Sequence, residues 1–154
     1  MDDCFFMKEA LVEARRAYDI GEVPIGCVIV YEGAIIGRGA NRRAAKKNVL
    51  CHAEIAAIDQ ACSFIGDWRL EKTTIYVTLE PCPMCAGAIV QARIPTLVFG
   101  AKSPKAGCAG SILDIVNEPR FNHQVQVKQG VMEDECAALM TEFFERFRTG
   151  KTCL

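Results

Sequence analysis

The feature that most constrains the fold of this chain is a regular exchange of helix-like and strand-like segments. Four segments carry apolar side chains at helical spacing: residues 2–21, 52–66, 83–94 and 133–148. Five short runs are rich in β-branched and apolar residues: two within 24–41, then 73–80, 95–101 and 123–131. This order predicts an α/β fold, a three-layer α/β/α sandwich whose mixed five-stranded sheet carries helices on both faces.

Two local details of this pattern are specific enough to check against a structure. The two runs within 24–41 surround Glu32-Gly33, so we expect a hairpin with its turn there. In the 52–66 segment, helical spacing predicts the inward face, which consists of Ile55, Ile58, Ala61 and Cys62.

Length and composition predict one globular domain over residues 1–154. The chain has 154 residues, of which 51% are hydrophobic and 24% charged, enough for one core and too few for two. No apolar run approaches the roughly 20 residues of a membrane helix. The acidic start lacks the basic and apolar regions of a signal peptide. We therefore expect no membrane partner and a cytoplasmic location.

The nine cysteines would indicate a disulfide scaffold in a secreted protein. Here their number is odd, and most stand singly in apolar surroundings, which favours reduced thiols in the cytosol. Six are expected to be small buried or inert thiols: Cys4, Cys27, Cys62, Cys108, Cys136 and Cys153.

The net charge of −1 argues against a broad surface that coats nucleic acid. A small basic footprint is still present, because the stretch "NRRAAKK" at 41–47 packs four cations into seven residues. Further cations stand at Lys102, Lys105, Arg146, Arg148 and Lys151. A solvated loop explains the stretch equally well on composition alone.

The stretch "EPCPMCAGAI" places Cys82 and Cys85 on the first turn of an expected helix, where both thiols can reach one cation. Pro83 suits the first helical position, and the helix amino end stabilises thiolates. Such a pair forms a redox site, a structural zinc site or a catalytic zinc site. No feature indicates the thioredoxin-like setting of a redox pair. A closed structural site would need two more ligands, and the chain has neither a second CxxC nor an H-x₃₋₅-H.

The stretch "CHAEIAAI" favours the catalytic alternative, in which three protein ligands leave one position open. His52 stands where a helix is expected to begin, with Glu54 two residues on, so that both side chains can face one cavity. A carboxylate beside the metal, without coordinating it, suits general acid/base catalysis. A capping or core role for His52, or Cys51 as the ligand in its place, are the weaker alternatives. His123 is expected to tie down a loop by hydrogen bonds.

His-Ala-Glu followed about thirty residues later by Pro-Cys-x-x-Cys is the signature of zinc-dependent nucleobase deaminases, which the chain resembles over nearly its full length. Within that superfamily it is most similar to bacterial tRNA adenosine deaminases, on the stretches "GEVPIG", "GRGAN", "HAEIAAI", "YVTLEPCPMCAGAI", "GAKSPKAGCAGS", "FNH" and "ECAALMTEFFERFR". The zinc motifs alone do not separate these enzymes from cytosine, guanine or deoxycytidylate deaminases. The resemblance implies a cytidine deaminase-like fold and hydrolytic conversion of the anticodon wobble adenosine of tRNA to inosine.

The resemblance also implies a cofactor, a mechanism and partners. One zinc ion per subunit would be held by His52, Cys82 and Cys85 and would activate water for attack on C6 of adenine. Glu54 would be the catalytic proton shuttle, taking a proton from that water and delivering protons to the ring nitrogen and the departing ammonia. The expected partners are the tRNA anticodon stem-loop and a second copy in a homodimer, since the family is typically dimeric.

The residues implied to bind the substrate are Asn41 at the base or ribose, the Ala53 backbone at the purine edge, Val23, Pro24 and Leu79 as pocket walls, Ser103, Lys105 at a phosphate, and Phe144 stacked on a flanking nucleotide. Buried packing explains the three wall residues equally well. Of the adjacent Phe143 and Phe144, we expect one in the core and the other near RNA.

Ser103 departs from the family pattern, which often has an acid at this position. A carboxylate near the ribose can accept a hydrogen bond from the 2′-hydroxyl and so distinguish RNA from DNA. Serine has no charge and a shorter reach. We therefore expect weaker RNA-over-DNA discrimination, or a different nucleotide context, than in relatives with the acid.

Two other functions stay open at this point. A deaminase of a free base or nucleoside, guanine or cytosine first among them, would share all four metal-site residues, although the basic stretch favours a polynucleotide. A non-catalytic zinc module is the second alternative, and Glu54 argues against it because a carboxylate beside a structural metal has no evident use.

Overall fold

A mixed sheet of five strands runs through the centre of the computed structural model, which describes residues 2–148. Its order is β2-β1-β3-β4-β5, with β1 antiparallel to β2 and β3, and with β3, β4 and β5 parallel. The strands are β1 (Gly26–Tyr31), β2 (Ala34–Ala40), β3 (Thr73–Leu79), β4 (Thr96–Ala101) and β5 (Gln126–Gln129). The predicted mixed sheet is confirmed.

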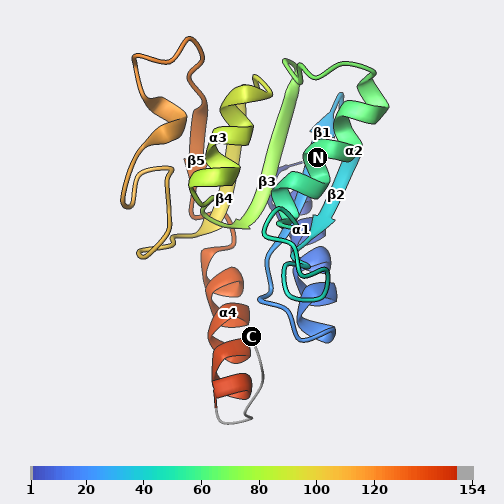
Figure 1. Ribbon diagram of the computed structural model, residues 1–154, viewed down its shortest axis with the longest axis vertical. Coiled ribbons are helices and arrows are strands. Elements are labelled where there is room, and N and C mark those ends of the chain that lie inside the picture. Colours follow the sequence, from blue (N-terminus) through green and yellow to red (C-terminus); the bar gives the residue numbers. More distant parts are fainter. Residues whose placement is uncertain (1, 149–154) are drawn as a thin grey trace.

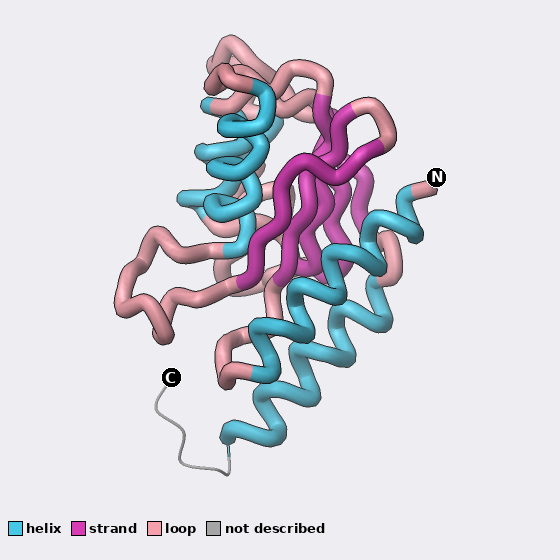
Figure 2. Tube along the Cα trace, turned by 90° about the vertical axis from the view of Figure 1, so that its right-hand side faces the viewer, coloured by secondary structure: helices cyan, strands magenta, loops and turns pink. Residues whose placement is uncertain are grey.

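Helices cover both faces of this sheet, as the three-layer prediction requires (Figures 1 and 2). The helices are α1 (Asp3–Asp19), α2 (Ala53–Ile65), α3 (Pro83–Gln91), the short 3₁₀ helix η1 (Ile115–Asn117) and α4 (Glu133–Arg148). Helices α2 and α3 pack on one face, and α1 and α4 pack on the other. None of the described helices combines the length and the apolar character needed to cross a membrane.

The turn between β1 and β2 is the one that the sequence predicts. Glu32 and Gly33 have φ values of 50° and 77°, and positive φ at both central residues matches the right-handed twist of a two-residue hairpin. The ends of two other predicted segments are wrong. The helix that starts at Pro83 ends at Gln91, because Arg93 adopts a φ of 60° and turns the chain toward β4. The last strand is confined to Gln126–Gln129, where it forms the sheet edge beside β4.

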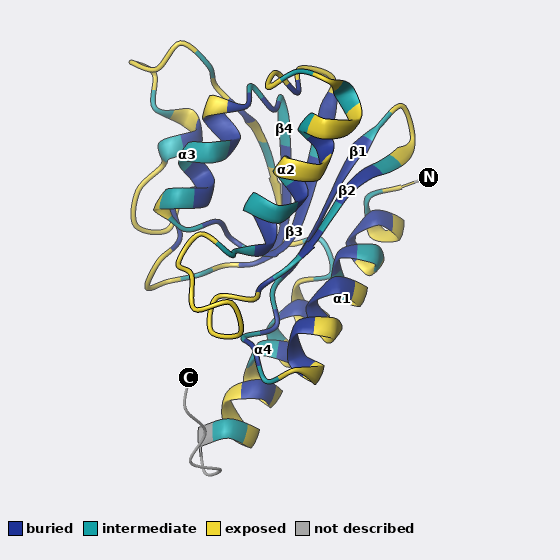
Figure 3. Cartoon of the chain, turned by 45° about the vertical axis from the view of Figure 1, so that its right-hand side comes forward, coloured by how far each residue is buried: buried dark blue, intermediate teal, exposed yellow. Residues whose placement is uncertain are grey.

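The inward face of α2 differs from the predicted one. Ala57 and Ala61 are fully buried, Ile58 and Cys62 are partly buried against the core, and Ile55 is only half-buried. Figure 3 shows buried, intermediate and exposed residues along α2. Helix α2 lies so close to β2 that small side chains face the sheet. The larger side chains are displaced to the flanks of the helix.

The thiols follow the prediction at most positions. The eight described cysteines are free, and Cys27, Cys108 and Cys136 are buried. Cys4 is exposed and Cys62 is half-buried, so for Cys4 the prediction of an inert thiol is the part that stays open. Cys153, Lys151 and the side chain of Arg148 lie outside the described residues.

His123 holds a loop, as expected. Its Nε2 lies 2.8 Å from the carbonyl oxygen of Ile94, which ties the segment before β5 to the segment between α3 and β4.

Gly39 sets the distance between β2 and the start of α2. A Cβ atom on this residue would lie 2.0 Å from the carbonyl oxygen of Ala53, a backbone atom that cannot move without the helix. Ala53 stands between His52 and Glu54. The position of both side chains therefore depends on the absence of a side chain on the neighbouring strand.

We expect Gly39→Ala to lower the free energy of unfolding by about 1–3 kcal/mol, the usual effect of forcing extra volume into a packed contact. Because the start of α2 must shift, affinity for a divalent metal should fall as well. Chemical denaturation and zinc competition measure the two effects. Ser63→Ala is the control, since Ser63 is exposed on α2 and alanine is favoured over serine inside a helix. Equal stability and metal affinity in both variants would contradict this account.

Candidate active site

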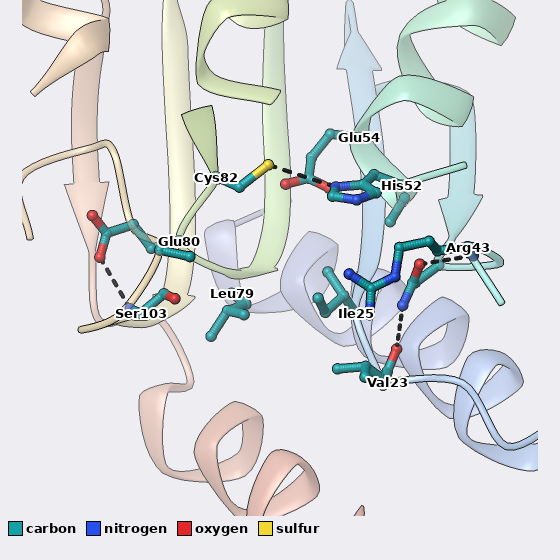
Figure 4. Close-up of a pocket in the computed structure, with 12 residues that line it drawn as sticks. Val23, Ile25, Arg43, His52, Glu54, Leu79, Glu80, Cys82 and Ser103 are labelled. Atoms are coloured by element: carbon teal, nitrogen blue, oxygen red, sulfur yellow. Dashed lines mark hydrogen bonds between the residues drawn. The ribbon is translucent and has the colours of Figure 1, made fainter. Parts of the chain in front are cut away.

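Two helices begin at the same edge of the sheet and bring their first residues together. Strand β3 ends at Leu79 and α3 follows after a short turn, while α2 begins where the loop after β2 returns to the sheet. The residues just before the two helices are His52 and Cys82, both with extended backbones (φ −88°, ψ 153° and φ −73°, ψ 176°). Neither side chain caps its own helix, so both are directed into the space between the helices (Figure 4).

His52, Cys82 and Cys85 form a compact triangle of potential metal ligands. Their ligand atoms all lie within 4.8 Å of one another, and His52 Nδ1 lies 3.6 Å from the Cys82 sulfur and 3.5 Å from the Cys85 sulfur. Tetrahedral zinc, with bonds of about 2.3 Å to sulfur and 2.0–2.1 Å to nitrogen, would separate these atoms by about 3.6 Å. The donor set and its spacing therefore fit zinc. Among the described residues, no other cluster of this kind occurs.

The two thiols are electrostatically unequal. The neighbouring Cys85 side chain is the main cause that lowers the pKa of Cys82 to about 5, and backbone N–H groups at the start of α3 act in the same direction. The Cys82 side chain in turn raises the pKa of Cys85, and burial raises it further. The site thus holds one thiolate near neutral pH, and a metal ion would displace the second proton.

Glu54, the second residue of α2, is buried and lines the same pocket as His52. Burial is the main cause that raises the pKa of Glu54 to about 7, and the nearby negative charge of Cys82 acts in the same direction. A carboxyl group with a pKa near neutrality can both accept and donate a proton at physiological pH. The prediction that His52 and Glu54 face one cavity is confirmed.

The pocket around these residues has a volume of about 210 Å³, below the 300–1,000 Å³ that is typical of sites for drug-sized ligands. Its lining residues are Val23, Ile25, Asn41, Arg43, His52, Ala53, Glu54, Leu79, Glu80, Cys82, Ser103 and Ala106. Five of the residues implied to bind substrate are in this set: Val23, Asn41, Ala53, Leu79 and Ser103.

Three of the predicted substrate residues lie outside the pocket lining. Pro24 is buried and does not line this pocket, which favours the packing alternative, and its role as a pocket wall stays a prediction. Lys105 is exposed on the loop after β4. On α4, Phe143 is fully buried and Phe144 is 43% exposed, which confirms that one of this pair belongs to the core.

Asn41 links two sides of the pocket rim. Its Nδ2 donates to the carbonyl oxygen of Val23 at 3.2 Å, and its Oδ1 accepts the backbone N–H of Arg43 at 3.2 Å. The buried carboxylate of Glu22 supports the same loop by accepting the backbone N–H groups of Ala44 and Ala45.

Arg43 and Glu80 are pocket residues that the sequence analysis did not single out. The Arg43 side chain extends from the rim toward the middle of the pocket (Figure 4), and within residues 2–148 no ion pair involves it. Arg43 lies in the basic stretch at 41–47, and that stretch was the sequence feature that could have indicated it. Glu80 is 3% exposed. The sequence feature that could have indicated it is a charge placed between an apolar strand and the cysteine motif.

Comparison with known proteins agrees with this geometry. Residues 1–148 match the family described as MafB19-like deaminase. The chain belongs to this deaminase family. The deaminase is 50% identical over 149 residues to the tRNA-specific adenosine deaminase of Bacillus subtilis (strain 168), which covers 97% of this chain and 92% of that protein. It is 47% identical over 150 residues to the tRNA-specific adenosine deaminase of Streptococcus pyogenes serotype M18 (strain MGAS8232), with 97% and 94% covered.

Solved structures agree as well. The deaminase resembles a protein from a study of A-to-I editing by tRNA:A34 deaminases at the wobble position, with 46% identity, a TM-score of 0.84 and coverage of 88% of this chain and 98% of that one. A guanine deaminase from Nitrosomonas europaea shares 22% identity with a TM-score of 0.76 over 92% of this chain and 84% of its own, a likeness in fold alone. The cytidine deaminase-like α/β fold expected from the sequence is confirmed.

Proposed function

We propose that this deaminase hydrolyses the 6-amino group of adenosine at the anticodon wobble position of tRNA and produces inosine. The observation that carries the proposal is the triangle of His52, Cys82 and Cys85 with Glu54 in the same small pocket. Relatives that cover nearly the whole chain at about half identity are tRNA-specific adenosine deaminases, which supports tRNA over a free base.

The cofactor of this proposal is one zinc ion per subunit, held by His52, Cys82 and Cys85. When bound, zinc supplies Lewis acidity that makes water a nucleophile near neutral pH. The number of ligands suits a catalytic site, because three protein side chains leave one of four tetrahedral positions open.

Glu54 is the proposed proton shuttle. The group must take a proton from water and give it to the ring nitrogen beside C6. It must then take the proton of the hydroxyl group that has added to C6 and give it to the departing ammonia. Its raised pKa of about 7 suits both directions of transfer. Because α2 fixes its backbone and burial excludes bulk water, the carboxyl group is held beside the reacting atoms throughout.

The pocket walls and rim would orient the nucleotide. We assign Val23 and Leu79 to the walls around the base, Asn41 to the base or ribose, and the Ala53 backbone to the purine edge, with Ser103 nearby. Arg43 adds a cation at the rim that suits a phosphate of the RNA backbone. Lys105 and the exposed ring of Phe144 are the proposed contacts with flanking nucleotides.

The proposal extends to the organisation of the molecule. Residues 1–154 form one deaminase domain, two copies form a homodimer, and the enzyme acts on tRNA in the cytoplasm. Small residues along α3, such as Ala88 beside Gly87, are half-buried in the single chain and would allow a second copy to pack closely.

The direct test is to incubate the zinc-loaded protein with an anticodon stem-loop that contains a wobble adenosine, and separately with free guanine, cytosine and adenosine. We expect inosine in the RNA alone. Glu54→Gln should keep about one zinc per chain and lose at least about 100-fold in kcat, the lower end of a general acid/base contribution. Glu71→Gln is the matched control and should keep full activity, because it changes an exposed carboxylate just before the start of β3, at the end of the strand away from the pocket.

Two results would contradict the proposal. Deamination of free guanine or cytosine without reaction of the hairpin would move the enzyme to the free-base class. Near-normal turnover by Glu54→Gln would remove this residue from proton transfer.

Ser103 is the proposed site of relaxed sugar discrimination. Serine carries no charge near the ribose. The ratio of kcat/KM on the RNA hairpin to kcat/KM on a matched DNA hairpin should therefore be lower in the unaltered protein than in Ser103→Asp. The expected difference is about tenfold, for one charge-assisted hydrogen bond. Ser63→Asp adds the same charge at an exposed position on α2 and should leave the ratio unchanged. An equal ratio for Ser103 and Ser103→Asp would refute the role.

A further inference from the structure

Glu80 is a buried charged residue that has no role in the proposed metal binding or in the proposed proton transfer. It lies between the end of β3 and Cys82, it is 3% exposed, and it lines the pocket beside Ser103 (Figure 4). It has no ion pair among residues 2–148. A carboxylate in such a place needs another source of stabilisation.

That stabilisation comes from the loop that follows β4. One oxygen of Glu80 accepts the backbone N–H of Ser103 at 3.1 Å and the Ser111 hydroxyl. The other accepts the backbone N–H groups of Ala109 and Ser111, both at 3.0 Å. Burial alone would raise the pKa of Glu80, but these hydrogen bonds lower it below its ordinary value.

The loop is therefore folded around a single carboxylate. Residues 102–113 contain no helix or strand, and most of them are exposed. The backbone of Gly107 touches the same group, since a Cβ atom on this residue would lie 2.3 Å from the Glu80 carboxyl carbon and 2.5 Å from each oxygen. Cys108 adds a bond from its N–H to the carbonyl oxygen of Pro81 at 2.8 Å. The loop is thus fastened to the turn that carries Cys82.

Only an ionised carboxylate satisfies all four donors. It offers acceptors on both oxygens, whereas the amide of glutamine has one acceptor oxygen and an NH₂ group that would face two of the donors. An unmet buried donor is costly. The four donors therefore require a carboxylate at position 80, although this carboxylate takes no part in the proposed proton transfer.

We propose that Glu80 is a positioning residue for substrate recognition, which holds residues 103–111 in the one arrangement that places Ser103 and Ala106 in the pocket wall. This inference rests on the proposed function. It assigns to Glu80 an effect on how tightly the nucleotide is held, separate from zinc binding by Cys82 and from proton transfer by Glu54.

The test uses Glu80→Gln in the zinc-loaded full chain with the wobble-adenosine hairpin. We expect KM to rise by about 10- to 100-fold, the factor that corresponds to one or two lost charge-assisted hydrogen bonds, with kcat within about threefold and zinc content at one per chain. Amide hydrogen exchange should increase by about tenfold or more at Ser103, Ala109 and Ser111. Glu118→Gln is the matched control, because that carboxylate accepts hydrogen bonds from Arg120 away from the pocket. It should change neither KM nor the amide exchange at Ser103, Ala109 and Ser111.

Gly107→Ala approaches the same carboxylate from the other side. Its methyl group displaces the carboxylate from its donors, so this variant should also raise KM. In a Glu80→Ala background the carboxylate is gone, so the added methyl group has nothing to displace. Gly107→Ala should then raise KM by less than about twofold over Glu80→Ala alone, since the two sites share one interaction. If Glu80→Gln does not fold, Ser111→Ala removes one hydrogen bond only and should raise KM in the same direction.

The outcomes separate the possible roles. An unchanged KM and unchanged exchange in Glu80→Gln would overturn the proposal, as would a loss confined to kcat or to zinc content, and so would full additivity of the Glu80 and Gly107 changes. Absence of inosine with the unaltered protein would refute the proposed function instead. The exchange measurement would then still decide whether Glu80 holds the loop.

Discussion

Two helix amino ends meet at one edge of the sheet, and the chemistry of the site depends on that meeting. The chain reaches the edge once after β2 and once after β3, strands that lie on either side of β1. His52 and Cys82 therefore come within 3.6 Å although thirty positions separate them in sequence. The helix amino end also supplies backbone N–H groups that favour thiolate over thiol. Sheet order and helix polarity together produce a ligand set for a soft divalent cation.

Buried carboxylates around the pocket differ in role because they differ in hydrogen-bond partners. Glu54 is buried beside the Cys82 sulfur, and the pKa of its carboxyl group rises to about 7, where proton transfer is easiest. Glu80 faces backbone donors, which keep it ionised and make it a fastening point for a loop. Glu22 does the same for the loop on the opposite rim. Hydrogen-bond partners thus keep two of these carboxylates in loop structure, whereas Glu54 is the one for which we propose proton transfer.

What the sequence could predict is what depends on short-range geometry. The order of helices and strands follows from residue periodicity. Each half of the metal triad is a local motif at an expected helix start, and the alternation of strands and helices places both starts at one edge of the sheet. The inward face of α2 was wrong at Ile55, because its closeness to β2 depends on Gly39, a residue far away in sequence. Arg43 and Glu80 were missed for a related reason. The basic stretch and the charge after the third strand mark these residues in the sequence. Their places in the pocket arise only when loops from different parts of the chain fold against one another.

The central claim is that one imidazole and two thiolates hold a zinc ion whose remaining position belongs to no protein side chain. X-ray absorption at the zinc edge of the purified, metal-loaded protein tests this most directly. The account predicts two sulfur neighbours at about 2.3 Å and nitrogen or oxygen neighbours at about 2.0–2.1 Å, of which one comes from imidazole. Cys82→Ala should remove one sulfur neighbour. A shell of three or four sulfurs, or one with two imidazoles, would mean a closed structural site and would contradict the account.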